Sequence, residues 1–238
     1  MTSAHPPAID IVFALYPGVT QLDFTGPWQV LSRVPGARLV AASPGGVPLP
    51  SEGLVFSGLA RLEDVRRCDI VLVPGGPGAL PAAEDPVFVG AVRRLAAQAR
   101  YVTSVCTGSL VLGAAGLLQG RRATSHWTVR DLLPAFGAVP DAGRVVRDGR
   151  VITGGGVTAG IDFALVLAAE LAGDEVAQAI QLGLEYAPAP PFDAGRPETA
   201  PPRVLERVRL ATAQLQAQRR AAVARIAGTF PIQGMGQA

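Results

Sequence analysis

The stretch YVTSVCTGSLVLGAAGLL, residues 101–118, decides the fold that we expect for this chain. Most residues before Cys106 are β-branched or aromatic and favour a buried strand, whereas the apolar residues from 110 to 118 favour a buried helix. Cys106 therefore falls at a strand-to-helix turn, where the small residues 107–109 allow a sharp bend and a close approach to the sulfur. The pattern is typical of the nucleophile elbow of hydrolases.

A position before a helix also affects the chemistry that we expect of Cys106. The first N–H groups of a helix have no partner inside it, and together with the helix dipole they stabilise a negative charge. We therefore expect the pKa of the Cys106 thiol to be lowered from about 8.5 toward neutrality. The alternative is an inert cysteine buried in the core, and the local sequence favours neither interpretation.

The composition excludes several classes of chemistry. The chain has 238 residues, 49% of them hydrophobic, which is enough for the core of one large domain, and we expect residues 1–238 to form a single domain. A net charge of +2 does not indicate a nucleic-acid or membrane partner. No lysine occurs, so the chain can form neither a Schiff base nor a nucleotide phosphate loop of the lysine type.

Histidine and cysteine are equally scarce. The two histidines are His5 and His126, and the two cysteines are Cys68 and Cys106, so we expect no metal site and no cofactor. A histidine base would have to be His126, for which a structural role is the first interpretation and a general base the second. Cys68 begins an apolar run and is expected to pack in the core.

Two cysteines make no disulfide framework, and a reactive thiol suits a reducing compartment, so we expect a cytoplasmic protein. The N-terminal stretch lacks the basic region of a secretion signal. No uncharged apolar stretch reaches the ~20 residues that span a membrane. We therefore expect no membrane association.

Apolar runs alternate with helical patterns along the chain, which predicts an α/β fold with a mostly parallel sheet and helices on both faces. The expected strands are 9–15, 37–42, 70–73 and 101–105, and the expected helices are 27–33, 87–99, 127–136, 159–172 and 175–184. Hairpins are expected at 47–56 and at 144–153. Residues 186–202 are rich in proline and should be extended, followed by a helix at about 203–228 whose arginines we interpret as a solvated face.

Ligands of open parallel sheets bind beyond the carboxyl ends of the strands, and three segments end there. The first holds Cys106, the second is VPGG at 73–76, and the third contains Asp23. Gly75 and Gly76 free the backbone to aim an N–H at a developing negative charge, although an ordinary glycine turn is the alternative. Asp23 either caps a helix or lies near a thiolate, where like charge would keep it protonated as a proton donor.

Five segments carry a resemblance to a known family: LDFTGP (22–27), VPGG (73–76), residues 101–124 with His126-Trp127, ITGGGVTAGIDFAL (152–165) and LEYAPAPPF (184–192). With these segments the chain resembles the ThiJ/PfpI superfamily, and within it the isocyanide hydratases. Thr107 stands where peptidase-like members have histidine, and Asp23 stands where members acting on glyoxals have glutamate. Related transcription regulators add a helix-turn-helix region, for which the tail after residue 202 is too short.

The resemblance implies a flavodoxin-like three-layer sandwich of the class I glutamine amidotransferase type, and a homodimer. It implies hydration of an isocyanide to an N-substituted formamide without metal or cofactor. Cys106 would attack the isocyanide carbon to form a thioimidate, with Asp23 as general acid and base. The N–H groups of Gly76 and Thr107 and the Thr107 hydroxyl would hold the charge. A glyoxalase or deglycase of the same superfamily, and a non-enzymatic cysteine redox or ligand sensor, are the alternatives.

Overall fold

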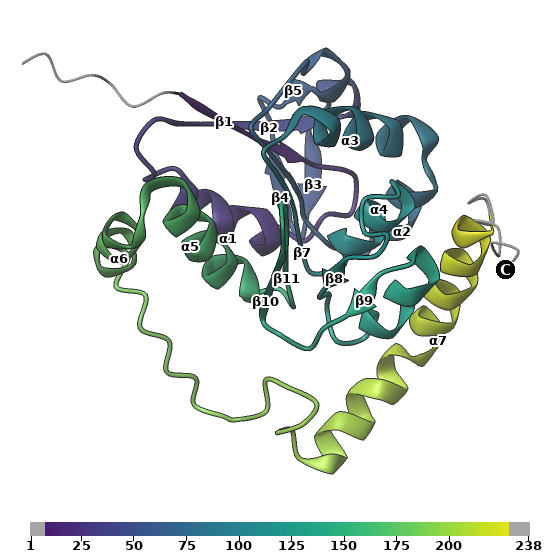
Figure 1. The fold of residues 1–238 in the computed structure, drawn as a ribbon. Helices are drawn as coiled ribbons and strands as arrows, with labels where there is room; N and C mark the ends of the chain where they lie inside the picture. The colour runs from purple at the N-terminus through teal and green to yellow at the C-terminus, as the bar shows by residue number, and fades with distance from the viewer. Residues whose placement is uncertain (1–7, 229–238) are drawn as a thin grey trace, which may run out of the picture.

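The centre of the molecule is a seven-stranded sheet with the strand order β10-β11-β7-β6-β1-β2-β5, seen in the computed structural model, which describes residues 8–228 (Figure 1). Neighbouring strands are parallel except for the β10–β11 hairpin. The strands are β1 (Ile9–Ala14), β2 (Ala37–Ser43), β5 (Ala60–Arg61), β6 (Ile70–Val73), β7 (Tyr101–Val105), β10 (Val145–Asp148) and β11 (Val151–Gly154). Every residue of β6 and β7 is buried, which explains why these runs are apolar without alternation.

Helices cover both faces of the sheet, so the expected three-layer α/β sandwich is confirmed. The helices are α1 (Leu22–Leu31), α2 (Ala79–Glu84), α3 (Pro86–Gln98), α4 (Gly108–Ala114), α5 (Ala159–Ala172), α6 (Asp174–Gly183) and α7 (Pro202–Ala227). Helices α1, α5 and α6 pack together on one face, and α2, α3 and α4 on the other (Figure 1). The loops at the carboxyl ends of β1, β6, β7 and β11 therefore meet at one edge.

Two expected helices differ from the structure. Helix α1 begins at Leu22 rather than at residue 27, so that Pro27 lies inside the helix and not near its start. The pattern at 127–136 forms the 3₁₀ segment η3 (Arg130–Phe136) instead of an α-helix. Pro134 lies within η3 and has no N–H to donate, which disfavours a regular α-helix there.

Short elements complete the fold. The hairpin expected at 47–56 is confirmed as β3 (Leu49–Ser51) paired with β4 (Leu54–Phe56), and the second expected hairpin is β10–β11. The pair β8 (Arg122–Ala123) and β9 (Val139–Pro140), and the 3₁₀ turns η1 (Pro44–Gly46) and η2 (Leu62–Asp64), were not expected from the sequence.

Helix α7 contributes to the hydrophobic core only with its second half. Ala222, Val223 and Ile226 are buried and belong to the same hydrophobic core as the sheet, whereas Val204 and Leu210 in the first half are exposed. This shared core supports the expected single domain, which stays a prediction. Between residues 8 and 228, no helix has the length and apolar character needed to cross a membrane. His5 lies outside the described residues.

Gly113 and Gly90 offer a test of the packing between α4 and η3. A Cβ at Gly113 in α4 would lie 2.4 Å from Cδ2 of Phe136, whereas a Cβ at Gly90 in α3 meets nothing within 4 Å. We expect Gly113→Ala to lower the free energy of unfolding by about 1–3 kcal/mol because it overpacks the core. Gly90→Ala should raise it by up to about 1 kcal/mol because alanine favours the helix. Urea unfolding of both variants measures this, and shifts of the same sign would contradict it.

Candidate active site

Cys106 lies between β7 and α4 in a left-handed backbone conformation, with φ of 57°. This region is unfavourable for a residue with a side chain and persists only where the surroundings fix it. The Cys106 N–H donates to the carbonyls of Gly154 (3.1 Å) and Gly155 (2.7 Å), and its carbonyl accepts from Ser125 Oγ at 3.0 Å. The strand-to-helix turn expected at Cys106 is therefore confirmed, and its role as a nucleophile stays a prediction.

Two glycines let the loop after β6 approach the elbow. A Cβ on Gly108 would lie 2.1 Å from the carbonyl oxygen of Val73, so only glycine fits at the start of α4. A Cβ on Gly75 would lie 2.5 Å from the Thr107 nitrogen and 2.7 Å from Asp23 Oδ2. Because neither glycine has a side chain, polar groups of α1, of the loop after β6 and of the elbow can approach one another closely.

Asp23 lies in the first turn of α1, and its side chain is fully buried. Its Oδ2 accepts a hydrogen bond from the Gly75 N–H at 2.9 Å, whereas Oδ1 has no hydrogen-bond partner among the described residues. The residue before α1 is Gln21, so the interpretation of Asp23 as a helix cap is wrong. A buried carboxyl oxygen without a partner is costly, and such groups are typical of functional sites.

The pKa values of Asp23 and Cys106 depend on each other. Burial raises the pKa of Asp23 to about 7, although contacts with Cys106 and with the Gly75 N–H oppose the rise. Burial and the nearby Asp23 raise the pKa of the Cys106 thiol, and the Thr107 N–H offsets only part of this. The expectation of a lowered thiol pKa is therefore wrong, because α4 is short and the sulfur is only slightly exposed. Because each group alters the pKa of the other, the two titrate as a coupled pair.

Thr107 and Gly76 are joined by hydrogen bonds. The Gly76 N–H donates to Thr107 Oγ1 at 2.9 Å, and the hydroxyl lies 3.2 Å from the Gly76 carbonyl oxygen. The Gly76 N–H is thus engaged by Thr107 Oγ1, and a role for Gly76 in holding charge at the sulfur stays a prediction. Thr107 itself contacts Cys106 with both its N–H and its hydroxyl, and both contacts lower the pKa of the thiol.

Tyr16 is a residue of this site that sequence reasoning missed. Its hydroxyl is buried and donates to the Pro74 carbonyl oxygen at 2.6 Å. Burial, then Asp23 and Cys106, raise the pKa of Tyr16. The sequence signal that points to Tyr16 is its position just after β1, in the same segment as Asp23.

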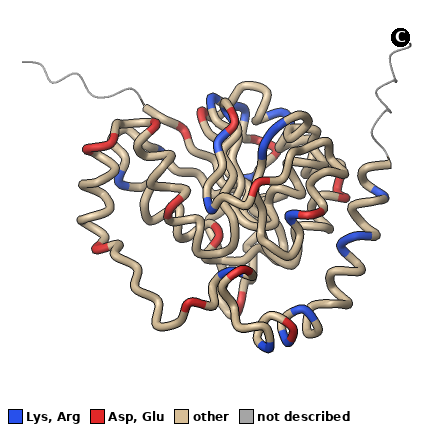
Figure 2. Tube along the Cα trace, turned by 60° about the horizontal axis from the view of Figure 1, so that its bottom comes forward, with Lys and Arg blue, Asp and Glu red and all other residues tan. Residues whose placement is uncertain are grey.

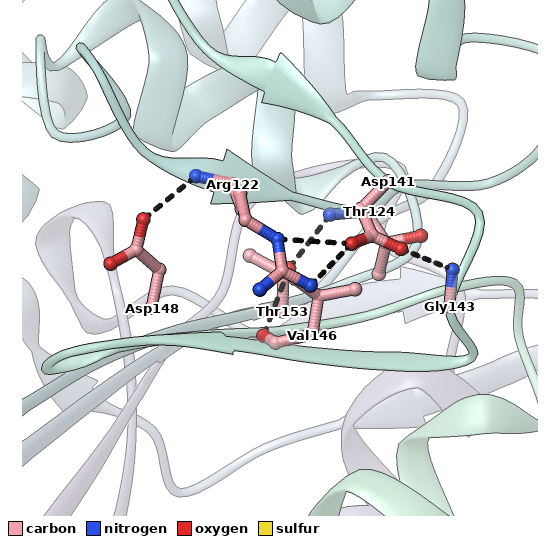
Figure 3. A network of polar contacts seen from close by, with 7 residues as sticks. All are labelled: Arg122, Thr124, Asp141, Gly143, Val146, Asp148 and Thr153. Atoms are coloured by element: carbon pink, nitrogen blue, oxygen red, sulfur yellow. Dashed lines mark hydrogen bonds and ion pairs between the residues drawn. The ribbon is translucent and has the colours of Figure 1, made fainter.

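The segment that carries His126 is tied to the sheet by the network in Figure 3. The Thr124 N–H donates to Thr153 Oγ1 of β11 at 2.9 Å, and Arg122 pairs with Asp141 at 2.6 Å. His126 accepts at Nδ1 from the Thr128 N–H at 3.3 Å, and burial lowers its pKa.

A cavity of about 550 Å³ opens beside His126, and its lining includes Ser125, Trp127 and Gly155. Cys106 is not part of this lining. Ser125 and Gly155 both bond to the Cys106 backbone, so the cavity adjoins the elbow.

Cys68 lies before β6, at the end of the sheet opposite Cys106, and is buried. Burial raises its pKa to about 12, as the core interpretation requires. Within the described residues, no group of three or more histidine, cysteine, aspartate or glutamate side chains could hold a metal ion.

Known proteins resemble the chain over most of its length. The model of the DJ-1/PfpI family matches residues 10–170. The chain is 56% identical over 203 residues to isonitrile hydratase of Pseudomonas putida, covering 85% of this chain and 89% of that protein. It is 33% identical to the HTH-type transcriptional regulator CdhR of Pseudomonas aeruginosa, covering 71% of this chain and 52% of the regulator. The crystal structure of a ThiJ/PfpI family protein from Pseudomonas syringae superposes with a TM-score of 0.86 at 41% identity, covering 94% of this chain and 92% of that one.

The raised pKa of Asp23 predicts a pH dependence of stability. Folding raises the pKa of this acid from 3.8 to about 7, so the folded state binds the proton more tightly. The free energy of unfolding therefore falls as the pH rises through this interval, by at most about 4 kcal/mol from this group. Asp23→Asn should show a smaller fall than the natural chain when urea unfolding is measured at about pH 4.5 and about pH 7.5. Equal falls would show that Asp23 titrates normally.

Proposed function

The chain belongs to the DJ-1/PfpI family, and from this premise we propose that it is an isocyanide hydratase with Cys106 as nucleophile and Asp23 as general acid and base. The 56% identity to an isonitrile hydratase supports the reaction. The observation that carries the assignment of residues is the buried Asp23 carboxyl, whose Oδ1 has no partner among residues 8–228 and which lies beside the elbow thiol.

An isocyanide makes an unusual demand on a catalytic site. Its terminal carbon must accept both the nucleophile and a proton, because both new bonds of the first addition form at the same atom. A nucleophile and an acid must therefore face one carbon. Cys106 and Asp23 are close enough to alter each other's pKa, which fits this demand. The head of an isocyanide is also linear and narrow, which suits a sulfur on a side chain that is only 5% exposed.

In the first step, the Asp23 carboxylate takes the thiol proton of Cys106, and the sulfur attacks the isocyanide carbon. Asp23 then gives the same proton to that carbon, which leaves a thioimidate with a new carbon–sulfur and a new carbon–hydrogen bond. A pKa of about 7 lets Asp23 accept and donate this proton near neutral pH. Covalent catalysis thus divides one difficult addition into two easier steps.

In the second step, Asp23 takes a proton from water, and the hydroxide adds to the thioimidate carbon while the nitrogen gains a proton from Asp23. The carbon–sulfur bond then breaks. The formamide leaves, and the remaining hydroxyl proton returns to the sulfur through Asp23. The Thr107 N–H and hydroxyl stabilise the negative charge on sulfur in both steps, and Gly76 keeps the hydroxyl in place.

This mechanism uses only side chains and water, so no metal or organic cofactor enters any step. A cytoplasmic location is part of the proposal, because both cysteines are free and the reaction needs a reduced Cys106. A homodimer is also part of it, on the family resemblance alone.

The nucleophile is tested with Cys106→Ala. The variant should form no formamide from a simple aryl or alkyl isocyanide, measured by chromatography of the product. Cys68→Ala is the matched control and should keep its turnover, since Cys68 lies at the opposite end of the sheet. Formamide production by Cys106→Ala would refute covalent catalysis. Absence of formamide with the natural chain, together with lactate formation from methylglyoxal, would replace the hydratase by the glyoxalase alternative.

The general acid is tested with Asp23→Asn. Asparagine keeps the shape of the side chain and an acceptor for the Gly75 N–H, but it cannot pass a proton. We expect turnover to fall by about 10²–10⁴-fold, as is typical for loss of general acid–base catalysis. The variant should still be alkylated at Cys106 by iodoacetamide, which mass spectrometry measures. An unchanged turnover would assign Asp23 a purely structural role.

A further inference from the structure

The carbonyl group of Cys106 is bound by two serine side chains. Ser125 Oγ donates to this oxygen at 3.0 Å, and Ser109 Oγ lies 3.3 Å from the same oxygen and 2.8 Å from Ser125 Oγ. Among the described residues, no backbone N–H donates to this carbonyl. Both serines are buried. A buried carbonyl needs a donor, so the backbone of the elbow depends on these two hydroxyls.

The distances within this cluster indicate where its protons lie. Each hydroxyl has one proton to donate. Ser125 gives its proton to the Cys106 carbonyl at 3.0 Å, and Ser109 gives its proton to Ser125 Oγ at 2.8 Å. A hydroxyl that accepts a hydrogen bond becomes a stronger donor, because hydrogen bonds in a chain polarise one another. Ser125 is therefore the main partner of the carbonyl, and Ser109 supports it.

The Cys106 carbonyl belongs to the same peptide unit as the Thr107 N–H. This unit is trans and planar, so its C=O and its N–H point in opposite directions. A donor that fixes the carbonyl therefore also fixes the direction of the N–H. The Thr107 N–H contacts the Cys106 sulfur and lowers the pKa of the thiol. The two serines thus hold this peptide unit on the side that faces away from the sulfur.

The segment that carries Ser125 is itself fixed to the sheet. The Thr124 N–H, one residue earlier, donates to Thr153 Oγ1 of β11 at 2.9 Å (Figure 3). The end of the same strand binds the Cys106 N–H. Cys106 is therefore held from both sides, its N–H by β11 and its carbonyl by a segment that β11 also holds. A left-handed residue persists only where its surroundings fix it in this way.

We infer that Ser125, supported by Ser109, is a positioning residue that fixes the peptide unit between Cys106 and Thr107 and so aims the Thr107 N–H at the sulfur. The consequence for turnover rests on the proposed hydratase function, whereas the effect on the sulfur does not depend on it.

The experiment compares Ser125→Ala, Ser109→Ala, Ser125→Thr and the control Ser104→Ala in the full chain. Ser104 lies on β7 two residues before Cys106, and its buried hydroxyl has no hydrogen-bond partner in the described part of the chain. Ser104→Ala therefore removes a buried hydroxyl without breaking a hydrogen bond. Ser125→Thr keeps the hydroxyl and is the conservative variant.

Three measurements are made on each variant. Iodoacetamide alkylation of Cys106 is followed against pH by mass spectrometry, kcat and KM are measured for formamide production from a simple alkyl isocyanide, and urea unfolding gives the stability. Every variant keeps the titratable and charged groups around the thiol and around Ser125, which are Asp23 from α1, Tyr16 after β1, His126 and Arg219 from α7.

We expect Ser125→Ala to shift the alkylation profile of Cys106 to higher pH by about 0.5–1 units, because the anionic sulfur loses a well-directed donor. Alkylation near neutral pH should then slow about three- to tenfold. The value of kcat should fall by about tenfold while KM stays within about twofold, as expected for a donor that acts on charge formed during the reaction. Ser109→Ala should shift the profile less, because Ser125 keeps its bond to the carbonyl. Ser125→Thr and Ser104→Ala should keep the natural profile.

A purely structural role would lower the free energy of unfolding in Ser125→Ala and leave the alkylation profile of the folded protein unchanged. This result would overturn the inference, as would an equal shift in Ser104→Ala. If Ser125→Ala does not fold, Ser109→Ala carries the test: a shift there and none in Ser104→Ala supports the inference, and no shift overturns it. Shifted profiles in a protein that forms no formamide would refute the hydratase function alone. Formamide production with unshifted profiles would refute the role of Ser125 alone.

Discussion

The left-handed backbone of Cys106 is the constraint on which the rest of the site depends. This conformation is maintained by strand pairing, because β11 lies beside β7 and its end offers the Gly154 and Gly155 carbonyls to the Cys106 N–H. The same strand order places β6 on the other side of β7, so Gly75 reaches the elbow from the opposite direction. The sheet therefore fixes the backbone angle of Cys106, and α4, with only 7 residues, contributes little.

Burial sets the electrostatics of this site more than the helix does. Burial drives both Asp23 and Cys106 toward their neutral forms, and the structure brings them close enough for each to alter the pKa of the other. A thiol that is neutral at rest is protected from oxidation, since thiolate character controls reactivity. Under the proposed mechanism the thiol becomes nucleophilic when its proton moves to Asp23, and the same proton is the one that the isocyanide carbon needs.

The sequence was sufficient wherever local pattern determines structure. The runs at 70–73, 101–105 and 159–172 coincide with β6, β7 and α5, because continuous apolar runs and a long helical pattern leave few alternatives. It was insufficient where distant residues decide. The sequence predicts too late a start for α1, because proline favours an early helix position whereas Pro27 lies inside the helix. The sequence predicts a lowered pKa for Cys106, whereas burial raises it. This burial arises from the whole sheet and cannot be derived from the neighbours of Cys106 in the sequence.

Tyr16 shows the same limit from the side of function. It stands 90 positions before Cys106 in the chain, and only the fold brings it close enough for Asp23 and Cys106 to raise its pKa. The basic residues of α7 are spread along the helix (Figure 2) and were interpreted together as a solvated face. This interpretation fits Arg220 and Arg225 with their exposed ion pairs. Arg219 looks the same in the sequence, but in the structure it is half-buried against Thr128 and has no carboxylate partner in the described part of the chain. This difference follows from the docking of α7 beside η3, which depends on residues far apart in the sequence.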